Sequence, residues 1–243
     1  MKALVSTSEL RNFIRDQREV IVLGSTAAAS LIAIQYFVKA DGMTALMRFC
    51  FPEGTFSADL LGLVGWSLGC VACYLILPLI VCRLSGWSMV ELGFNVRGLK
   101  QHGPIYLVCF APMAVIILLV SARPDFQATY PFLDAPPNLQ EFLIWELCYA
   151  AQFIALEFFF RGFLVHGLRK HLSSVAAVMV MLFPYLMIHF GKPMLESIGA
   201  LIAGIVLGTL SLRTGSIAGG ALLHIAVAWS MDTTALWRAG WFQ

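Results

Sequence analysis

The 243-residue sequence is 59% hydrophobic and only 12% charged, with a formal net charge of +2 at pH 7. A typical soluble domain is about 45–50% apolar and about 25% charged, so this composition is that of a protein surrounded largely by lipid. The small, scattered charge excludes a nucleic-acid surface, and no Gly-rich phosphate loop or dinucleotide fingerprint is present. We therefore expect an all-α, polytopic membrane helix bundle that contacts membrane lipid and no nucleic acid.

Apolar runs long enough to cross a membrane follow a polar segment over residues 1–19. Because lipid offers no hydrogen-bond partners to the backbone, each run is expected to be a helix. About seven transmembrane helices are predicted, three within residues 20–122 and four in a core over residues 139–232. Their expected ranges are 20–38, 60–82, 104–122, 139–160, 173–190, 197–212 and 216–231.

Local signals mark some of the expected helix ends and contacts. Asn138 followed by Glu141 has the spacing of an N-cap box and predicts a helix start. Gly191-Lys192-Pro193 predicts a tight turn. The pairs Gly204/Gly208 and Gly65/Gly69 have the four-residue spacing that lets membrane helices approach closely.

Four ionisable residues interrupt the apolar runs of the second half: Glu157, Arg161, His189 and His224. An ionisable side chain in the hydrocarbon costs at least about 2.5–3.5 kcal/mol, so each is a candidate functional residue. Glu157 and Arg161 lie four residues apart and share a helix face. The pair fits either a structural ion pair or a catalytic carboxylate that Arg161 orients. Two histidines near such a pair favour a site in one shared cavity.

Three segments containing these residues resemble the motifs of the CPBP (Abi) intramembrane proteases, which include CAAX-processing prenyl endopeptidases. Residues 156–164, Leu-Glu-Phe-Phe-Phe-Arg-Gly-Phe-Leu, resemble the EExxxR-G motif. Tyr185 to His189 is similar to FxxxH, with Tyr for Phe, and His224 to Ala228 is similar to HxxxN, with Ala for Asn. The resemblance covers about residues 139–232.

The resemblance implies a hydrolytic mechanism inside the membrane. In this family a glutamate and a histidine activate a water that attacks a peptide carbonyl, and the last-helix histidine and asparagine stabilise the oxyanion. Applied to this sequence, the catalytic residues would be Glu157, His189, His224 and Arg161. No cofactor and no metal is implied.

The sequence departs from the family pattern at two positions. Leu156 stands where the family has its first glutamate, and neighbouring helix residues point about 100° apart. Ala228 replaces the asparagine, whose loss as an oxyanion donor is worth on the order of 3 kcal/mol in the barrier. Glu146, Glu196 and Asp232 are further carboxylates that could line the cavity, and none replaces the glutamate missing at Leu156.

Three hypotheses of function follow. The first is an intramembrane endopeptidase of glutamic type that cleaves a membrane-associated protein or peptide. The second is a family member that has lost its chemistry and acts as a binding, chaperone or immunity-type membrane protein. The third is a zinc protease whose metal is held by His189, His224 and Glu157. The bilayer is expected to be the plasma (inner) membrane.

The distribution of Lys and Arg predicts a cytoplasmic N-terminus. With seven spans, a reporter fused after Gln243 should read as non-cytoplasmic, and a cytoplasmic reading would contradict this topology. The expected inside segments carry ten of these residues against five outside, the ten being Lys2, Arg11, Arg15, Arg18, Arg83, Arg97, Lys100, Arg169, Lys170 and Arg213.

Overall fold

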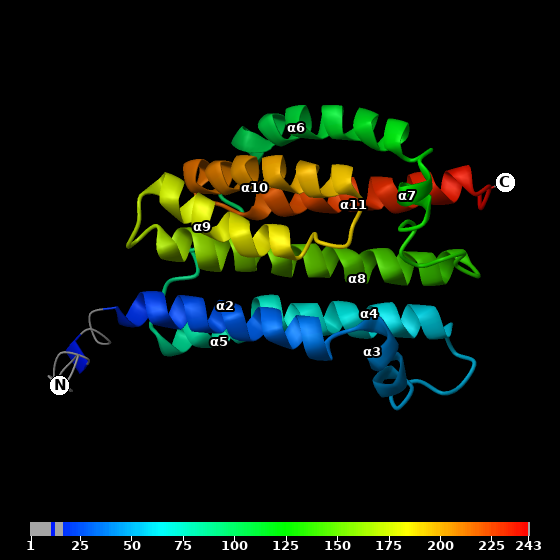
Figure 1. Ribbon diagram of the computed structural model, residues 1–243, viewed down its shortest axis with the longest axis horizontal. Helices are drawn as coiled ribbons and strands as arrows, with labels where there is room; N and C mark the ends of the chain where they lie inside the picture. Colours follow the sequence, from blue (N-terminus) through cyan, green and yellow to red (C-terminus); the bar gives the residue numbers. More distant parts are fainter. Residues whose placement is uncertain (1–10, 13–16, 243) are drawn as a thin grey trace, which may run out of the picture.

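The computed structural model describes residues 11–12 and 17–242, and most of the polar segment 1–19 lies outside this range. The described residues form helices and connecting loops without strands. The long helices lie side by side with their axes roughly aligned (Figure 1). An all-α bundle was predicted, and this prediction is confirmed.

The N-terminal part of the bundle is a layer of helices at the bottom of Figure 1. It contains α2 and a long helix in which α4, a π-helical turn η1 and α5 follow one another without a break. The short α3, which the sequence analysis did not predict, packs against α4. The bounds are α2 Arg18–Phe37, α3 Ala40–Met47, α4 Ala58–Val71, η1 Ala72–Ile76 and α5 Leu77–Leu84.

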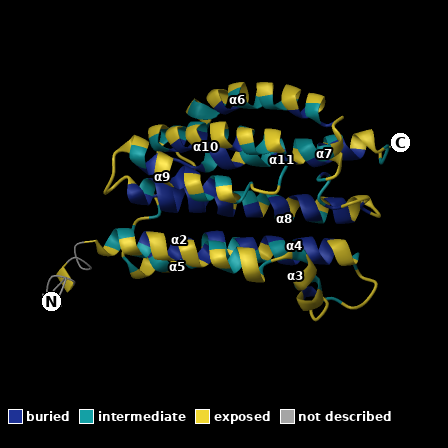
Figure 2. Cartoon of the chain, viewed as in Figure 1, coloured by how far each residue is buried: buried dark blue, intermediate teal, exposed yellow. Residues whose placement is uncertain are grey.

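The remaining helices build the rest of the bundle around a continuous helix made of α8 and the π-helical segment η2. Most residues of this helix are buried. In contrast, α6, which lies on the side of the bundle opposite the N-terminal layer, is largely exposed (Figure 2). The bounds are α6 Leu99–Val120, α7 Pro124–Gln127, α8 Leu139–Glu157, η2 Phe158–His166, α9 Ser174–Met187, α10 Met194–Thr214 and α11 Ala218–Arg238.

Five helices of the described part are long and apolar enough to cross a membrane, judged by length and composition. The apolar α9 has 14 residues and is shorter, and α11 is not among the five. A total of seven spans therefore stays a prediction. The five are Arg18–Phe37, Ala58–Leu84, Leu99–Val120, Leu139–His166 and Met194–Thr214.

The predicted helix signals are found where they were expected. The Asn138 side chain accepts a hydrogen bond of 2.9 Å from the Glu141 N–H and caps α8. Gly191 has φ of 93°, a left-handed conformation that glycine adopts without a Cβ clash, and the chain turns there from α9 into α10. Both predictions are confirmed.

The glycines of α10 lie against α9. A Cβ added at Gly204 would come within 2.5 Å of Leu182 Cδ1 and 3.1 Å of Tyr185 Cδ1, and one at Gly208 would lie 3.1 Å from Val178. The Gly204/Gly208 pair thus permits the close approach that its spacing predicted. Since Tyr185 belongs to the site described below, this contact also fixes one wall of that site.

We predict that Gly204→Ala destabilises the protein by about 1–3 kcal/mol through overpacking against α9. The matched control is Gly199→Ala in the same helix, where an added Cβ would meet nothing within 4 Å. Both changes gain the same helix propensity, so the difference between the two variants reports packing alone. Thermal unfolding in detergent measures it. Equal stability of the two variants would contradict the assigned contact.

Candidate functional site

The site begins with an ion pair inside the central helix. Glu157 is the last residue of α8, and Arg161 lies one turn later in η2. Arg161 Nη1 is 3.1 Å from Glu157 Oε1, and both residues have 0% exposed surface. A lone charge in this position would be strongly unfavourable, whereas each side chain here partly compensates the other. The predicted pairing of the two residues is therefore present.

The same carboxylate oxygen also contacts a histidine from α11. His224 Nδ1 lies 2.7 Å from Glu157 Oε1, which is a hydrogen-bond distance. Gly220 precedes His224 by one helical turn, and a Cβ there would lie only 2.8 Å from Glu157 Oε2. Glycine at this position therefore allows the carboxylate to lie close to α11. The ring of Phe153, from α8, stacks on the imidazole with 4.9 Å between the ring centroids.

Tyr185 of α9 is a site residue that the sequence analysis underrated. Its hydroxyl oxygen lies 3.3 Å from His224 Nε2, and its ring lies under the guanidinium of Arg161, with Cζ 4.2 Å from the ring centroid. The family pattern has Phe here, and the sequence analysis assigned no role to the Tyr that replaces it. The added hydroxyl was the signal that pointed to a polar role.

His189 lies beside this group without joining it directly. Its Nδ1 is 2.9 Å from the carbonyl oxygen of Tyr185, and its ring packs edge-on against the Tyr185 ring, with the centroids 4.8 Å apart. Ser197 Oγ donates to the His189 carbonyl at 3.0 Å. The structure thus brings Arg161 and His224 to the same oxygen of Glu157, whereas His189 contacts Tyr185 and Ser197.

The two positions that depart from the family pattern are apolar in their surroundings as well. Leu156 is buried in the main hydrophobic cluster, together with the phenylalanines of η2. Ala228, one turn after His224, is buried in a second cluster with Trp145 and Tyr149. Neither position holds a polar group that takes the place of the family residue.

The other carboxylates make separate contacts. Asp232 accepts hydrogen bonds from Trp145 Nε1 at 2.9 Å and from the Phe132 N–H at 3.2 Å. Glu196 accepts from the Tyr130 hydroxyl at 2.8 Å and from Lys192 Nζ at 2.7 Å. Glu146 is buried, and its carboxylate has no hydrogen-bond partner among the described residues. None of the three forms a hydrogen bond or ion pair with the Glu157 group in the part of the chain that the structure describes.

The positions of possible metal ligands bear on the zinc hypothesis. Within residues 11–12 and 17–242, no group of three or more His, Cys, Asp and Glu side chains is arranged to hold a metal ion. The set of His189, His224 and Glu157 that this hypothesis requires is therefore not assembled as a ligand cluster.

Comparison with known families relates the segment that holds this site to one family. Residues 138–230 match the family model described as type II CAAX prenyl endopeptidase Rce1-like. No curated protein and no solved structure matches the chain. The matched segment contains the whole group described above, so the site lies in the part of the chain that is similar to this protease family. The resemblance seen in the motifs is confirmed by this match, and the protein is an integral membrane protein.

We predict that Arg161→Ala costs about 3–5 kcal/mol of stability, because it leaves the buried Glu157 carboxylate without its cation. Unfolding in mixed micelles measures the loss. Arg83→Ala is the control, since Arg83 is exposed and should change stability by no more than about 0.5 kcal/mol. The loss of stability should be smaller when Arg161→Ala is made in a Glu157→Gln background, because no buried carboxylate is then left without its cation. An undiminished loss in that background would contradict the pairing.

Proposed function

We propose that the protein is an intramembrane endopeptidase that hydrolyses a peptide bond of a membrane-associated protein or peptide. The observation that carries this proposal is the 2.7 Å contact between Glu157 Oε1 and His224 Nδ1 inside the segment that matches the Rce1-like family. A buried carboxylate bound to one nitrogen of a histidine is the arrangement that prepares the other nitrogen for proton transfer.

The proposed base is His224, oriented by Glu157. An ionised carboxylate only accepts hydrogen bonds, so Nδ1 of His224 carries the proton and donates a hydrogen bond to Glu157. Nε2 then keeps its lone pair and faces the Tyr185 hydroxyl. Arg161 supports this state, because its permanent positive charge favours the ionised form of Glu157. This assignment gives Glu157 and Arg161 positioning roles and gives His224 the proton transfer.

The reaction is proposed to proceed in two steps. A water oxygen bonds to the peptide carbonyl carbon while the water's proton moves to Nε2 of His224, which produces a tetrahedral oxyanion. The carbon–nitrogen bond then breaks, and the proton on Nε2 passes to the leaving amine. The Tyr185 hydroxyl lies 3.3 Å from Nε2 and is proposed to bind the oxyanion in place of the missing asparagine.

His189 is proposed as a second proton acceptor. Because its Nδ1 faces the Tyr185 carbonyl, the proton resides on Nδ1 and the lone pair on Nε2. Its edge-on contact with the Tyr185 ring supports a role beside His224, with which it would share the activation of water.

A second candidate function is a family member without activity, which acts by binding other membrane proteins. Leu156 and Ala228 favour this candidate, since each replaces a polar family residue with an apolar one. The retention of a complete ion pair and two histidines inside the bundle favours the enzyme, because each of these groups is unfavourable in lipid.

The substrate can be found by comparing membrane and released peptides from cells with and without the protein, followed by cleavage of a matching synthetic peptide in proteoliposomes. We predict that Glu157→Gln and His224→Ala each lower the cleavage rate by roughly 10²-fold or more, the usual scale for a general base. His171→Ala is the control, because His171 lies outside the site and contacts Glu19. Cleavage that survives both site variants in folded protein would locate the chemistry elsewhere, and the absence of any cleavage product would favour the binding protein.

A separate prediction concerns Tyr185. Tyr185→Phe should keep the aromatic ring under Arg161, and therefore the fold, while removing the hydroxyl that faces His224. The loss of one such hydrogen bond in the transition state should slow cleavage by about 10-fold with little change in KM. A rate equal to that of the unchanged protein would contradict an oxyanion role for Tyr185.

A further inference from the structure

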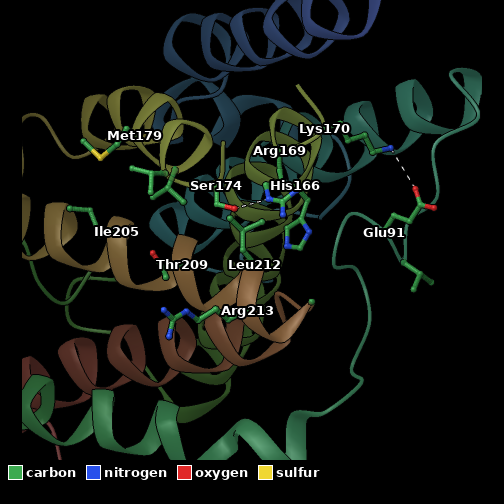
Figure 3. A pocket seen from close by; sticks show the side chains of 14 residues that line it. Glu91, His166, Arg169, Lys170, Ser174, Met179, Ile205, Thr209, Leu212 and Arg213 are labelled. Carbon is green, nitrogen blue, oxygen red and sulfur yellow. Dashed lines mark hydrogen bonds and ion pairs between the residues drawn. The ribbon is translucent and has the colours of Figure 1, made fainter. Parts of the chain in front are cut away.

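A groove at one end of the bundle is separate from the Glu157 group. It lies where η2 and α10 end and α9 begins, and the loop between α5 and α6 forms one side of it. Its volume is about 800 Å³, which is within the usual range of pockets for small ligands. Figure 3 shows the side chains that line it.

One part of the groove carries an excess of positive charge. Arg169, Lys170 and Arg213 line it, with Glu91 as the only carboxylate among the lining residues. Lys170 Nζ lies 3.5 Å from Glu91 Oε2, so these two charges compensate each other. Arg169 and Arg213 form no ion pair among the described residues, and Arg169 uses only its Nε to donate to Ser174 Oγ at 2.6 Å. Two guanidinium groups are therefore left to bind an anion.

The other part of the groove is apolar and opens along the outside of the bundle. Val175 and Met179 lie one turn apart on α9, and Ile205 and Thr209 lie one turn apart on α10, so both helices turn a stripe of side chains toward the groove. Val175, Met179 and Ile205 are 73%, 43% and 40% exposed, on surfaces that meet lipid if these helices span the membrane. The groove thus has a cationic head and an exposed apolar channel between α9 and α10.

We propose that this groove binds an anionic phospholipid, with its phosphate on Arg169 and Arg213 and one acyl chain between α9 and α10. Guanidinium groups bind phosphate oxygens in pairs of hydrogen bonds, and basic pockets between membrane helices on the cytoplasmic side recognise anionic head groups. The lysine and arginine count predicts this end of the bundle to be cytoplasmic, where anionic lipids are concentrated. A water-soluble anion would use only the cationic head, whereas a phospholipid uses both parts.

The test compares lipid binding by native mass spectrometry of the purified full-length protein, with phosphatidylglycerol against phosphatidylcholine. The unchanged protein should retain phosphatidylglycerol in preference. The double variant Arg169→Gln/Arg213→Gln should bind it about 25-fold more weakly, since each basic residue near anionic lipid contributes a factor of about five. The matched control is Arg83→Gln/Arg97→Gln, which removes the same charge from exposed residues outside the groove at the same end. Equal weakening in both double variants would show a general charge effect and overturn the proposal.

Two further experiments distinguish phospholipid binding from the binding of other anions and from loss of the fold. Thr209→Phe fills the channel and leaves both arginines in place, so it should also weaken phosphatidylglycerol binding. Inorganic phosphate should stabilise the protein far less than the lipid does in thermal unfolding, and equal stabilisation would overturn the proposal in favour of a phosphate site. Should the double variant unfold, Arg213→Gln alone is the test, because the Arg213 side chain forms no hydrogen bond or ion pair among the described residues. This single variant should weaken binding about 5-fold.

Discussion

One carboxylate oxygen, Oε1 of Glu157, organises the second half of this protein. It contacts the guanidinium of Arg161 in its own helix and the imidazole of His224 in α11. The bundle can bury this acid because a cation and a hydrogen-bond donor are both present. The helices that supply them must therefore pack at a fixed distance, and small residues such as Gly220 permit that distance.

The rest of the polar group depends on this contact. The orientation of His224 directs Nε2 toward the Tyr185 hydroxyl, and the Tyr185 ring in turn covers Arg161. His189 packs edge-on against the same ring. The result is a chain of polar and aromatic side chains from three helices in a bundle that is otherwise apolar. In the proposed function this group prepares His224 for proton transfer, even though Leu156 stands where the family pattern has its first glutamate.

Most of the fold could be predicted from the sequence because lipid imposes helices on apolar runs and because Asn138, Gly191 and Gly204 mark their ends and contacts. The additional short helices α3 and α7 could not be predicted, since their few residues have no long apolar period. Five helices meet the length and composition of a membrane span, whereas α9 is short and α11 contains the polar His224 and Asp232. Helix formation was thus easier to predict than the number of spans.

The candidate site was predictable in its residues and less so in its contacts. The spacing of Glu157 and Arg161 within one helix determines their pairing, so the sequence predicted it. Contacts between helices depend on rotation and depth, which a sequence without coordinates does not give. For this reason the contact of His224 with Glu157 and the contacts of Tyr185 and His189 emerged only from the structure.

The most direct test of the central contact is the protonation of His224 in the folded protein. Nitrogen-15 NMR of histidine-labelled protein in detergent, with His224→Ala to assign the signal, distinguishes the two ring nitrogens. We predict that Nδ1 carries a proton that is held toward Glu157, and that Glu157→Gln changes the Nδ1 signal. A neutral His224 with its proton on Nε2, unaffected by Glu157→Gln, would contradict this prediction.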